Sequence, residues 1–473
     1  MRRIILPVIA VLCSWSFAQG QKMTLQECVK IGLDNNLTVK RSVYNVESYQ
    51  VGLLSAKGSF LPTLNLNGSG SQNYGRNLNP VTYQYFQGIT KTINPSVSGQ
   101  LLLFNGLRYQ NNYRQNRINV QAADLDLEKA KNDVIITIVT NYTNVILNKE
   151  LYENAKFQLN SSQQQLDRIK KQVAAGALPK SNELTQEATV ATNETNLITQ
   201  ENLYNQSVLL LKQSMLVPAS TPIEVVVPDI AMEDLSITQT PEEIYSISAK
   251  TLPQVKSAML KVDAAQYALK ASRAAYYPRL SFTYGAASNY NSASDRHILP
   301  DGTYTDRPIG IVKPTGDSVF TRVYGAQSFT GGYGVSNQLS DNLYKNIGLS
   351  LSIPILNGFQ TRTGVQQAII NRELAAITVK ETENTLRQAI ETAYNNAQAA
   401  AKTYTAAIKQ VSANEEAFRM TQQRHENGAA TYIEYQVASN DLFSAKSGLA
   451  RAKYTFILTK KVLEFYQGKT IEY

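Results

Sequence analysis

The two histidines of the chain, His297 and His425, are the first candidates for metal binding or acid–base catalysis. Neither lies in an HxxH, CxxC or HExxH pattern, the spacings that bring two ligands together. The segment Gly68, Ser69 and Gly70 is glycine-rich, but it lies in a strand pattern rather than before a helix, so it is not a phosphate-binding loop. No nucleophile constellation is present either. The sequence therefore predicts a protein that is not an enzyme, without a metal site or a cofactor.

The first 18 residues have the pattern of a secretory signal peptide. Arg2 and Arg3 precede an apolar run over residues 4–12, and small residues follow up to Ala18, where cleavage is expected. The run is too short to span a bilayer, and no later stretch reaches 18 consecutive apolar residues. After cleavage Cys28 is the only cysteine, so no internal disulfide can form.

The charge gives no sign of nucleic-acid binding. The formal net charge of +9 falls to +7 when Arg2 and Arg3 are removed, and the excess is scattered along the chain.

An internal repeat organises the rest of the chain. The sequence FLPTLNLNGSG at 60–70 resembles YPRLSFTYGAA at 277–287, and both copies continue to an Asn-Gly pair and then to a glycine that interrupts a helical pattern. The second copy holds an extra 36 residues between its proline and its Asn-Gly pair, within residues 291–341, which read as a long loop. The matched landmarks are Pro62 and Pro278, Asn105-Gly106 and Asn357-Gly358, and Gly176 and Gly428.

Each repeat is expected to contain one very long helix. Residues 107–175 and 359–427 are 69 residues each, lack proline and keep helical spacing, so each helix would be roughly 100 Å long. No compact domain accommodates such a helix. The predicted domains are a first repeat over 19–216, with short helices before and after the long one (23–59 and 180–215), a linker over 217–240 with a strand at 223–227, and a second repeat over 241–473, with short helices at 241–276 and 432–467.

Between the proline and the Asn-Gly pair of each repeat the apolar period changes from 3.6 to 2. The segments 61–104 and 278–356 each predict a β-hairpin with one apolar and one polar face, about long enough to cross a bilayer. A soluble β-sandwich would show the same alternation, but the signal peptide and the tyrosine-rich flanks favour an outer-membrane barrel. Four strands cannot close a barrel, so the chain must assemble: two copies would give eight strands and three copies twelve.

The ordered set of tandem repeat, Pro62 and Pro278, the Asn-Gly pairs and the glycine turns resembles the TolC-like outer-membrane efflux family over essentially the whole mature chain. The resemblance implies an α+β membrane protein: four strands per chain in a trimeric twelve-stranded outer-membrane barrel, continued by a long α-helical barrel in the periplasm. It also implies a homotrimer in outer-membrane lipid that serves as the exit duct of an efflux or secretion system. Its partners would be a periplasmic adaptor (membrane fusion) protein and an inner-membrane pump of the RND or ABC type.

In this family the two glycine turns form the periplasmic tip. Glycine permits the left-handed backbone that a helix reversal needs, and Pro179 can start the next helix. The family places an acidic residue six positions after the tip glycine, which Glu434 matches and Asn182, next to Glu183, does not. A ring of three Glu434 carboxylates would favour cations, although a glutamate there can also simply stabilise the helix start. The expected tip residues are Gly176, Ala177, Leu178, Pro179, Gly428, Ala429, Ala430 and Thr431, and the candidate gate residues are Glu434, Asn182, Glu183, Arg168 and Arg424.

Two other classes of protein remain alternatives at this point. A secreted trimeric coiled-coil fibre or adhesin would also contain long helices, but would not need two barrel hairpins per chain. A periplasmic hydrolase would need a nucleophile constellation that the sequence lacks.

Overall fold

The computed structural model describes residues 21–80, 83–227, 237–294, 296–330 and 333–469. The expected signal peptide, residues 1–18, lies outside them. The chain divides into two compact units, which are described one at a time. The first contains Met1–Val51, Arg117–Ala264 and Arg372–Tyr473, and the second contains Gly52–Asn116 and Ala265–Asn371.

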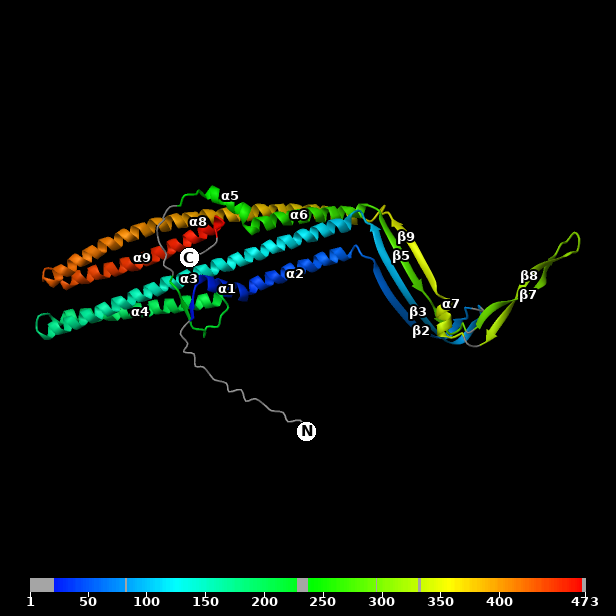
Figure 1. The fold of residues 1–473 in the computed structure, drawn as a ribbon, viewed down its shortest axis with the longest axis horizontal. Helices are drawn as coiled ribbons and strands as arrows, with labels where there is room; N and C mark the ends of the chain where they lie inside the picture. Colours follow the sequence, from blue (N-terminus) through cyan, green and yellow to red (C-terminus); the bar gives the residue numbers. More distant parts are fainter. Residues whose placement is uncertain (1–20, 81–82, 228–236, 295, 331–332, 470–473) are drawn as a thin grey trace, which may run out of the picture. The chain divides into compact units, whose positions relative to one another are not determined.

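Long helices dominate the first unit (Figure 1). The helices α3 (Arg108–Ala174) and α8 (Gln360–Glu426) have 67 residues each, and the helices that follow them, α4 (Lys180–Ser214) and α9 (Tyr432–Tyr466), have 35 each. Each long helix begins in the second unit and forms a helical hairpin with its shorter partner in the first. The two repeats therefore have the same helical plan.

The shorter helices expected before each hairpin are interrupted. The helix expected over 23–59 divides at Asn36 into α1 (Leu25–Asn35) and α2 (Leu37–Gly58), because the Asn36 side chain accepts hydrogen bonds from the backbone nitrogens of Thr38 and Val39. The helix expected over 241–276 divides into α5 (Pro241–Thr251), α6 (Pro253–Arg273) and the 3₁₀ turn η1 (Ala274–Tyr276). Pro253 explains the second break, since it disfavours the helical conformation of the residue before it.

The core of the first unit joins segments that are distant in the sequence. Strand β1 (Gln21–Met23) pairs in parallel with β4 (Ile223–Val225). The Tyr142 hydroxyl, from the middle of α3, is within hydrogen-bonding distance of the carbonyl oxygens of Met23 (3.2 Å) and Val226 (2.7 Å). Around it pack apolar side chains from α1, α2, α3, α4 and α9, among them Cys28, Val39, Ile138, Leu211 and Ile457, together with Met215 just after α4.

The α8–α9 hairpin has a second apolar cluster in the same unit. Leu386, Ile390 and Ala397 of α8 are buried with Leu463 of α9 and with Ile244 and Val255 from α5 and α6. Small side chains at Ala393, Ala397 and Ala400 are buried along α8, which permits close approach of the neighbouring helices.

The second unit is built on an antiparallel sheet with the order β2-β3-β5-β9. Its strands are β2 (Thr63–Leu78), β3 (Tyr85–Phe104), β5 (Arg279–Ala287) and β9 (Tyr344–Ser352), and the short β6 (Tyr290–Asn291) pairs with β3. Leu64, Leu66, Ile347, Leu349 and Leu351 are all exposed at alternate positions of the two outer strands. One face of these strands thus presents apolar side chains that the chain itself leaves uncovered.

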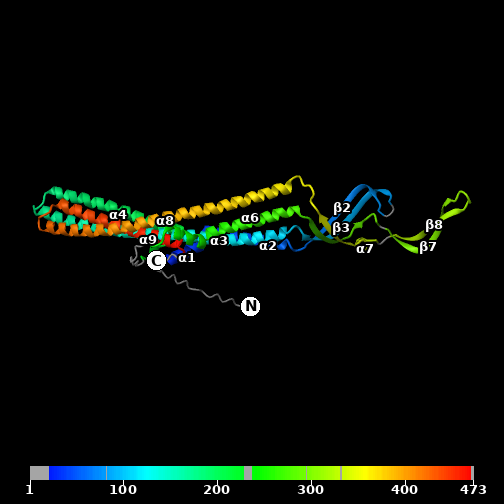
Figure 2. The same ribbon diagram turned by 90° about the horizontal axis from the view of Figure 1, so that it is seen from above.

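Residues 291–341 contain more structure than the loop expected there. Strands β7 (Arg296–Ile311) and β8 (Ser318–Thr330) form an antiparallel hairpin, and α7 (Val335–Asp341) follows. Within the second unit, both views show this hairpin continuing outward beyond the sheet (Figures 1 and 2). Pro300, Gly302, Pro308 and Gly310 made the segment read as a loop, and the pairing shifts register at Pro300/Tyr304 and Pro308/Gly310, which accommodates them.

Candidate functional site

The turn after α3 ends the helix with a glycine in the left-handed conformation. Gly176 has φ of 74°, its nitrogen donates to the Val173 carbonyl (3.0 Å), and the Ala177 nitrogen donates to the Gln172 carbonyl (2.9 Å). This pair of bonds is the Schellman motif, which satisfies carbonyls that the helix end leaves free. A Cβ atom at position 176 would meet no neighbour, so glycine is favoured here by backbone conformation and not by space.

The turn after α8 has the same geometry. Gly428 has φ of 73°, its nitrogen donates to the His425 carbonyl (3.1 Å), and the Ala429 nitrogen donates to the Arg424 carbonyl (2.7 Å). The two turns are thus equivalent in backbone as well as in position. Their surfaces consist mainly of small exposed residues: Ala174, Ala175, Gly176, Ala177, Gly428 and Ala429.

The helices that leave the two turns start differently. At the start of α9 the Thr431 backbone nitrogen donates to a Glu434 carboxylate oxygen (2.7 Å), and the Glu434 nitrogen donates to the Thr431 hydroxyl (3.2 Å), which completes a capping box. At the start of α4 the capping position is Pro179, which offers no side-chain hydrogen bond. The difference between the copies noted at Glu434 and Asn182 therefore has a structural counterpart.

The capping box keeps the Glu434 carboxylate charged. Hydrogen bonds from the Thr431 backbone nitrogen and hydroxyl lower the pKa of Glu434 below its ordinary value, and the nearby Arg424 lowers it further. The side chain is exposed. Glu434 thus performs the helix-start role directly, and it also presents an exposed negative charge at the turn at neutral pH.

Asn182 and Glu183 lie in the first turn of α4 and are less exposed than Glu434. Glu183 is buried, and its carboxylate lies 2.7 Å from Nζ of Lys180. One turn further on, Gln186 is fully buried and donates from Nε2 to the Ser162 carbonyl of α3 (2.7 Å). Gln186 thus fastens α4 to α3, and the Glu183 carboxylate is paired with Lys180 within the first turn.

The two arginines have different surroundings. The Arg424 guanidinium donates to the Ala429 carbonyl (3.1 Å), so it closes the turn that follows its own helix. Arg168 is exposed on α3, and its positive charge acts on Tyr435 of α9, where it partly offsets the rise in that group's pKa due to burial. The structure thus brings Arg168 of the first hairpin close to α9 of the second.

An aromatic cluster at the second turn was not expected from the sequence. The His425 ring stacks on Tyr435 (ring centroids 5.2 Å apart), which also contacts Phe418 (5.5 Å). Nδ1 of His425 lies 3.1 Å from the Ala430 carbonyl, and since a carbonyl only accepts, Nδ1 carries the proton. Burial raises the pKa of Tyr432 to about 12. The seven-residue spacing of Phe418 and His425, together with Tyr432 and Tyr435 at i and i+3, was the signal in the sequence.

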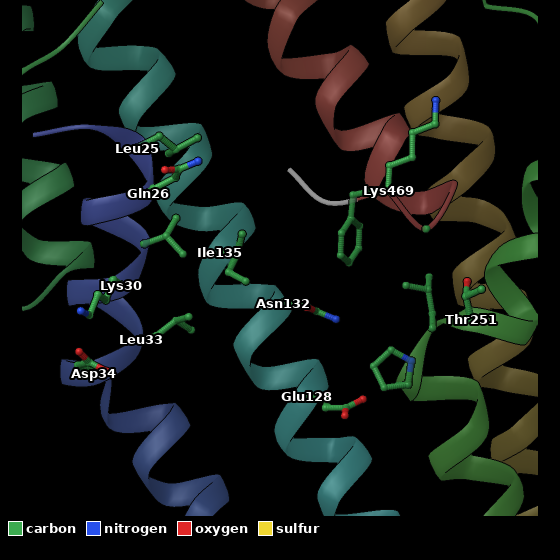
Figure 3. A pocket seen from close by; sticks show the side chains of 15 residues that line it. Leu25, Gln26, Lys30, Leu33, Asp34, Glu128, Asn132, Ile135, Thr251 and Lys469 are labelled. Carbon is green, nitrogen blue, oxygen red and sulfur yellow. The ribbon is translucent and has the colours of Figure 1, made fainter. Parts of the chain in front are cut away.

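A separate cavity of about 620 Å³ lies in the first unit, far along the chain from both turns (Figure 3). The helix α1 and the middle of α3 line one side of it, and the α5–α6 junction and the segment after α9 line the other. Its walls are mainly apolar, with Leu25, Leu33, Ile135, Leu252 and Phe465 among them. Glu128 and Asn132 of α3 also line it and point toward the α5–α6 junction.

Among the described residues, no group of three or more histidine, cysteine, aspartate or glutamate residues is placed to hold a metal ion. None of the helices described has an apolar stretch of the length needed to span a membrane.

A family model described as outer membrane efflux protein matches residues 30–215 and 244–468, one match in each repeat. The chain therefore belongs to the outer membrane efflux protein family. This confirms the family expected from the repeat and its turns, and with it an outer-membrane location.

Relatives and solved structures agree with this assignment. The chain is 21% identical to the proteases secretion protein PrtF of Dickeya chrysanthemi, with 98% of this chain and 91% of the relative covered. It is also 21% identical to the outer membrane efflux protein BepC of Brucella suis, with coverage of 96% and 88%. Its fold matches CusC (TM-score 0.74, 16% identity, 94% and 92% covered) and VceC of Vibrio cholerae (TM-score 0.73, 14% identity, 95% and 97% covered). The α+β channel fold is thus confirmed.

Proposed function

We propose that three copies of the chain form the exit duct of an efflux or secretion assembly that spans the cell envelope. The observation that carries this proposal is the sheet β2-β3-β5-β9, whose outer strands β2 and β9 have no further partner among the described residues. An open sheet edge is not tolerated in lipid, because its free N–H and C=O groups would lose their hydrogen bonds to water. Three copies supply twelve strands, enough to enclose a channel.

The helical hairpins support the same proposal. Each chain contributes two hairpins of 67 and 35 residues, so three copies would contribute six similar hairpins to one helical duct. A coiled-coil fibre or adhesin would not require the two long sheet strands in each repeat. In the proposed homotrimer, twelve strands would close a barrel in outer-membrane lipid, and the six hairpins would continue it as one duct.

The partners follow from the envelope that such a duct must cross. We infer a periplasmic adaptor (membrane fusion) protein and an inner-membrane pump of the RND or ABC type. The names of the relatives PrtF and BepC refer to protease secretion and to efflux. Small molecules or proteins delivered by the pump are the proposed cargo.

The two glycine turns are the proposed docking surface for the adaptor. Their small exposed side chains let the tip of another helical hairpin approach closely. The docking residues are Gly176, Ala177, Leu178, Pro179, Gly428, Ala429, Ala430 and Thr431.

Glu434 is the proposed gate residue, because its charge is maintained by the capping box and is exposed. Three copies would place three carboxylates around one axis and favour cations. Arg424 and Arg168 would hold the closed arrangement of the turns through salt bridges, and Asn182 and Glu183 are the corresponding gate positions of the first repeat.

The assembly is tested by the oligomeric state of the mature protein in detergent. A heat-sensitive trimer is expected on native gels and by light scattering. A monodisperse monomer with native circular dichroism would contradict the proposal, since its sheet edges would then be stable without other copies.

A further inference from the structure

The hairpin β7–β8 is a large surface feature to which the proposed duct assigns no role. It is fixed at its base by α7. Gln338 of α7 is almost fully buried, and its side-chain amide accepts from the Asn291 nitrogen (2.9 Å) and contacts the carbonyls of Asn291, Ser294 and Tyr333. The Ser288 hydroxyl also donates to the Leu339 carbonyl (2.7 Å). These bonds tie α7 to the segment 288–294, which leads from the sheet toward the hairpin.

The two faces of the hairpin differ in chemistry. The register pairs Tyr304 with Tyr324 and Pro308 with Phe320, so these four side chains share one face. The ring centroids of Tyr304 and Tyr324 lie 6.4 Å apart. The exposed fractions of Tyr304, Phe320 and Tyr324 are 54%, 56% and 69%. We call this the aromatic face.

The opposite face is aliphatic and is also uncovered. Val319 and Val323 alternate with Phe320 and Tyr324 along β8, so they point away from the aromatic face, and both are exposed. Thr305, Arg307 and Thr321 lie on the same side by the same alternation. We call this the aliphatic face.

Such a hairpin is poorly stabilised alone. A two-stranded hairpin is marginally stable in water unless further strands or another packing surface cover it. Within the described residues β7 and β8 pair only with each other. Something outside this chain is therefore expected to cover its faces.

The edges of the hairpin are less suited to this than its faces. The strand β7 contains Pro308, which has no N–H to donate, and two register shifts interrupt its pairing. Prolines and bulges are the features by which natural sheets prevent pairing along an edge. A ring of equivalent copies would have to pair the β7 edge of one copy with the β8 edge of the next, so these features of β7 disfavour edge pairing and favour contact through the two faces.

We infer that the aromatic face of one β7–β8 hairpin packs against the aliphatic face of the hairpin of the next copy, so that three hairpins form a collar at the outer mouth of the duct. This inference rests on the proposed trimer, which would anchor three hairpins at one rim, because each hairpin lies in the chain between the neighbouring sheet strands β5 and β9. Tethering gives a high effective concentration, so even a weak contact becomes populated. Residues 302–324 carry three cationic and two anionic side chains, so like copies repel one another little.

A face-to-face collar requires unlike faces to meet. In a ring of three, each contact joins one face of a copy to the other face of its neighbour, since only a two-fold axis joins like surfaces. The salt bridge of Asp306 and Arg322 (3.2 Å) and the stacking of Arg322 on Tyr304 (4.0 Å) keep the charges of the aromatic face occupied within the hairpin. The aromatic rings are then the surface left for a neighbour.

Paired cysteines test this arrangement. Phe320→Cys places a thiol on the aromatic face and Val323→Cys places one on the aliphatic face of the same strand, so the two cannot join within one hairpin. Oxidation of the double variant is expected to give covalent dimers and trimers on denaturing gels. The matched control, Phe320→Cys with Ser318→Cys, has both thiols on the aromatic face and is expected to give no such ladder.

The same samples on native gels separate the two levels of the proposal. If the variant with Phe320→Cys and Val323→Cys forms trimers on native gels but gives no covalent ladder, the collar is overturned and the duct stands. The absence of trimers would reject the duct itself.

Removal of residues 304–324 provides a second test. It is expected to raise single-channel conductance with efflux retained, and an unchanged conductance would contradict a collar at the mouth. If the hairpin instead lies on the lipid surface, a photoreactive group at Tyr324 will label lipid and not a second copy, which would also overturn the inference.

Discussion

Thr431 and Glu434 stabilise each other at the start of α9: the Thr431 nitrogen donates to the carboxylate at 2.7 Å, and the Glu434 nitrogen donates to the hydroxyl at 3.2 Å. The equivalent start of α4 has Pro179 and no side-chain cap. Two turns with the same helix ending thus lead into helices with different electrostatics. Only the second presents an exposed, hydrogen-bonded carboxylate.

Glu434→Gln should reduce the cation selectivity of the channel. Glutamine can still accept the hydrogen bond of the capping box, so α9 should start at the same residue while the charge is lost. The reversal potential across a bilayer under a salt gradient measures the effect. As a control, Thr431→Ala weakens the cap by about 0.5–2 kcal/mol and leaves the charge, so it should retain selectivity. Selectivity that is identical in wild type and Glu434→Gln would reduce Glu434 to its capping role.

The start of α9 should resist mild acid. The pKa of Glu434 is lowered in the folded state, so the stabilisation is complete above the unfolded-state pKa and is lost as the pH falls through the lower folded-state pKa. Hydrogen exchange of the amides of the first turn should therefore stay slow to a pH below that of an ordinary glutamate. Glu434→Gln should remove this pH dependence, and the same dependence in the variant would assign it to another group.

Bulky residues at the turns should abolish efflux without affecting assembly. Ala177→Trp and Ala429→Trp add volume at exposed positions outside the helices, so folding and trimer formation should be retained. Cells should become more sensitive to toxic compounds, because the adaptor can no longer approach closely. Ala177→Ser and Ala429→Ser are the matched controls and should behave as wild type. Normal efflux with both tryptophans present would reject these turns as the docking surface.

Tyr142→Phe should destabilise the first unit. The buried hydroxyl is within hydrogen-bonding distance of the Met23 and Val226 carbonyls, next to the β1–β4 pair. Its loss should lower the free energy of unfolding by about 1–3 kcal/mol, because a buried carbonyl is left without that partner. The midpoint of thermal or urea unfolding of the helical signal measures the change. An unchanged midpoint would show that water or a backbone group replaces the hydroxyl.

Cys28 should be inert in the native protein. It is fully buried, and burial raises the pKa of its thiol to about 12, so very little reactive thiolate exists at neutral pH. Maleimide should label it only after unfolding. Rapid labelling of the native protein would show that the core around α1 opens readily.

The sequence was sufficient for the architecture because the repeat and its periodicities are long. Sixty-nine residues without proline between Gly106 and Gly176 leave little alternative to a long helix, and α3 is observed as Arg108–Ala174. The family and the fold class expected from this pattern are confirmed by the comparisons. The roles of the turn residues in docking and gating stay predictions.

The parts that the sequence did not reveal depend on contacts between distant residues or on local irregularity. Pro300 and Pro308 favoured a loop, because a single sequence does not show that register shifts can accommodate them in β7. In the sequence Gln338 is an ordinary polar residue of a short helix. Its structural role depends on hydrogen bonds to Asn291 and Ser294, which are distant in the chain. The proximity of Arg168 to Tyr435 likewise joins two repeats that the sequence separates by more than 260 positions.

The central claim, that the chain forms a channel, is tested most directly by recording single-channel currents from the purified protein in planar lipid bilayers. The account predicts discrete conductance steps that favour cations and that come from the trimeric fraction. Silent bilayers after verified insertion of native trimers would contradict it.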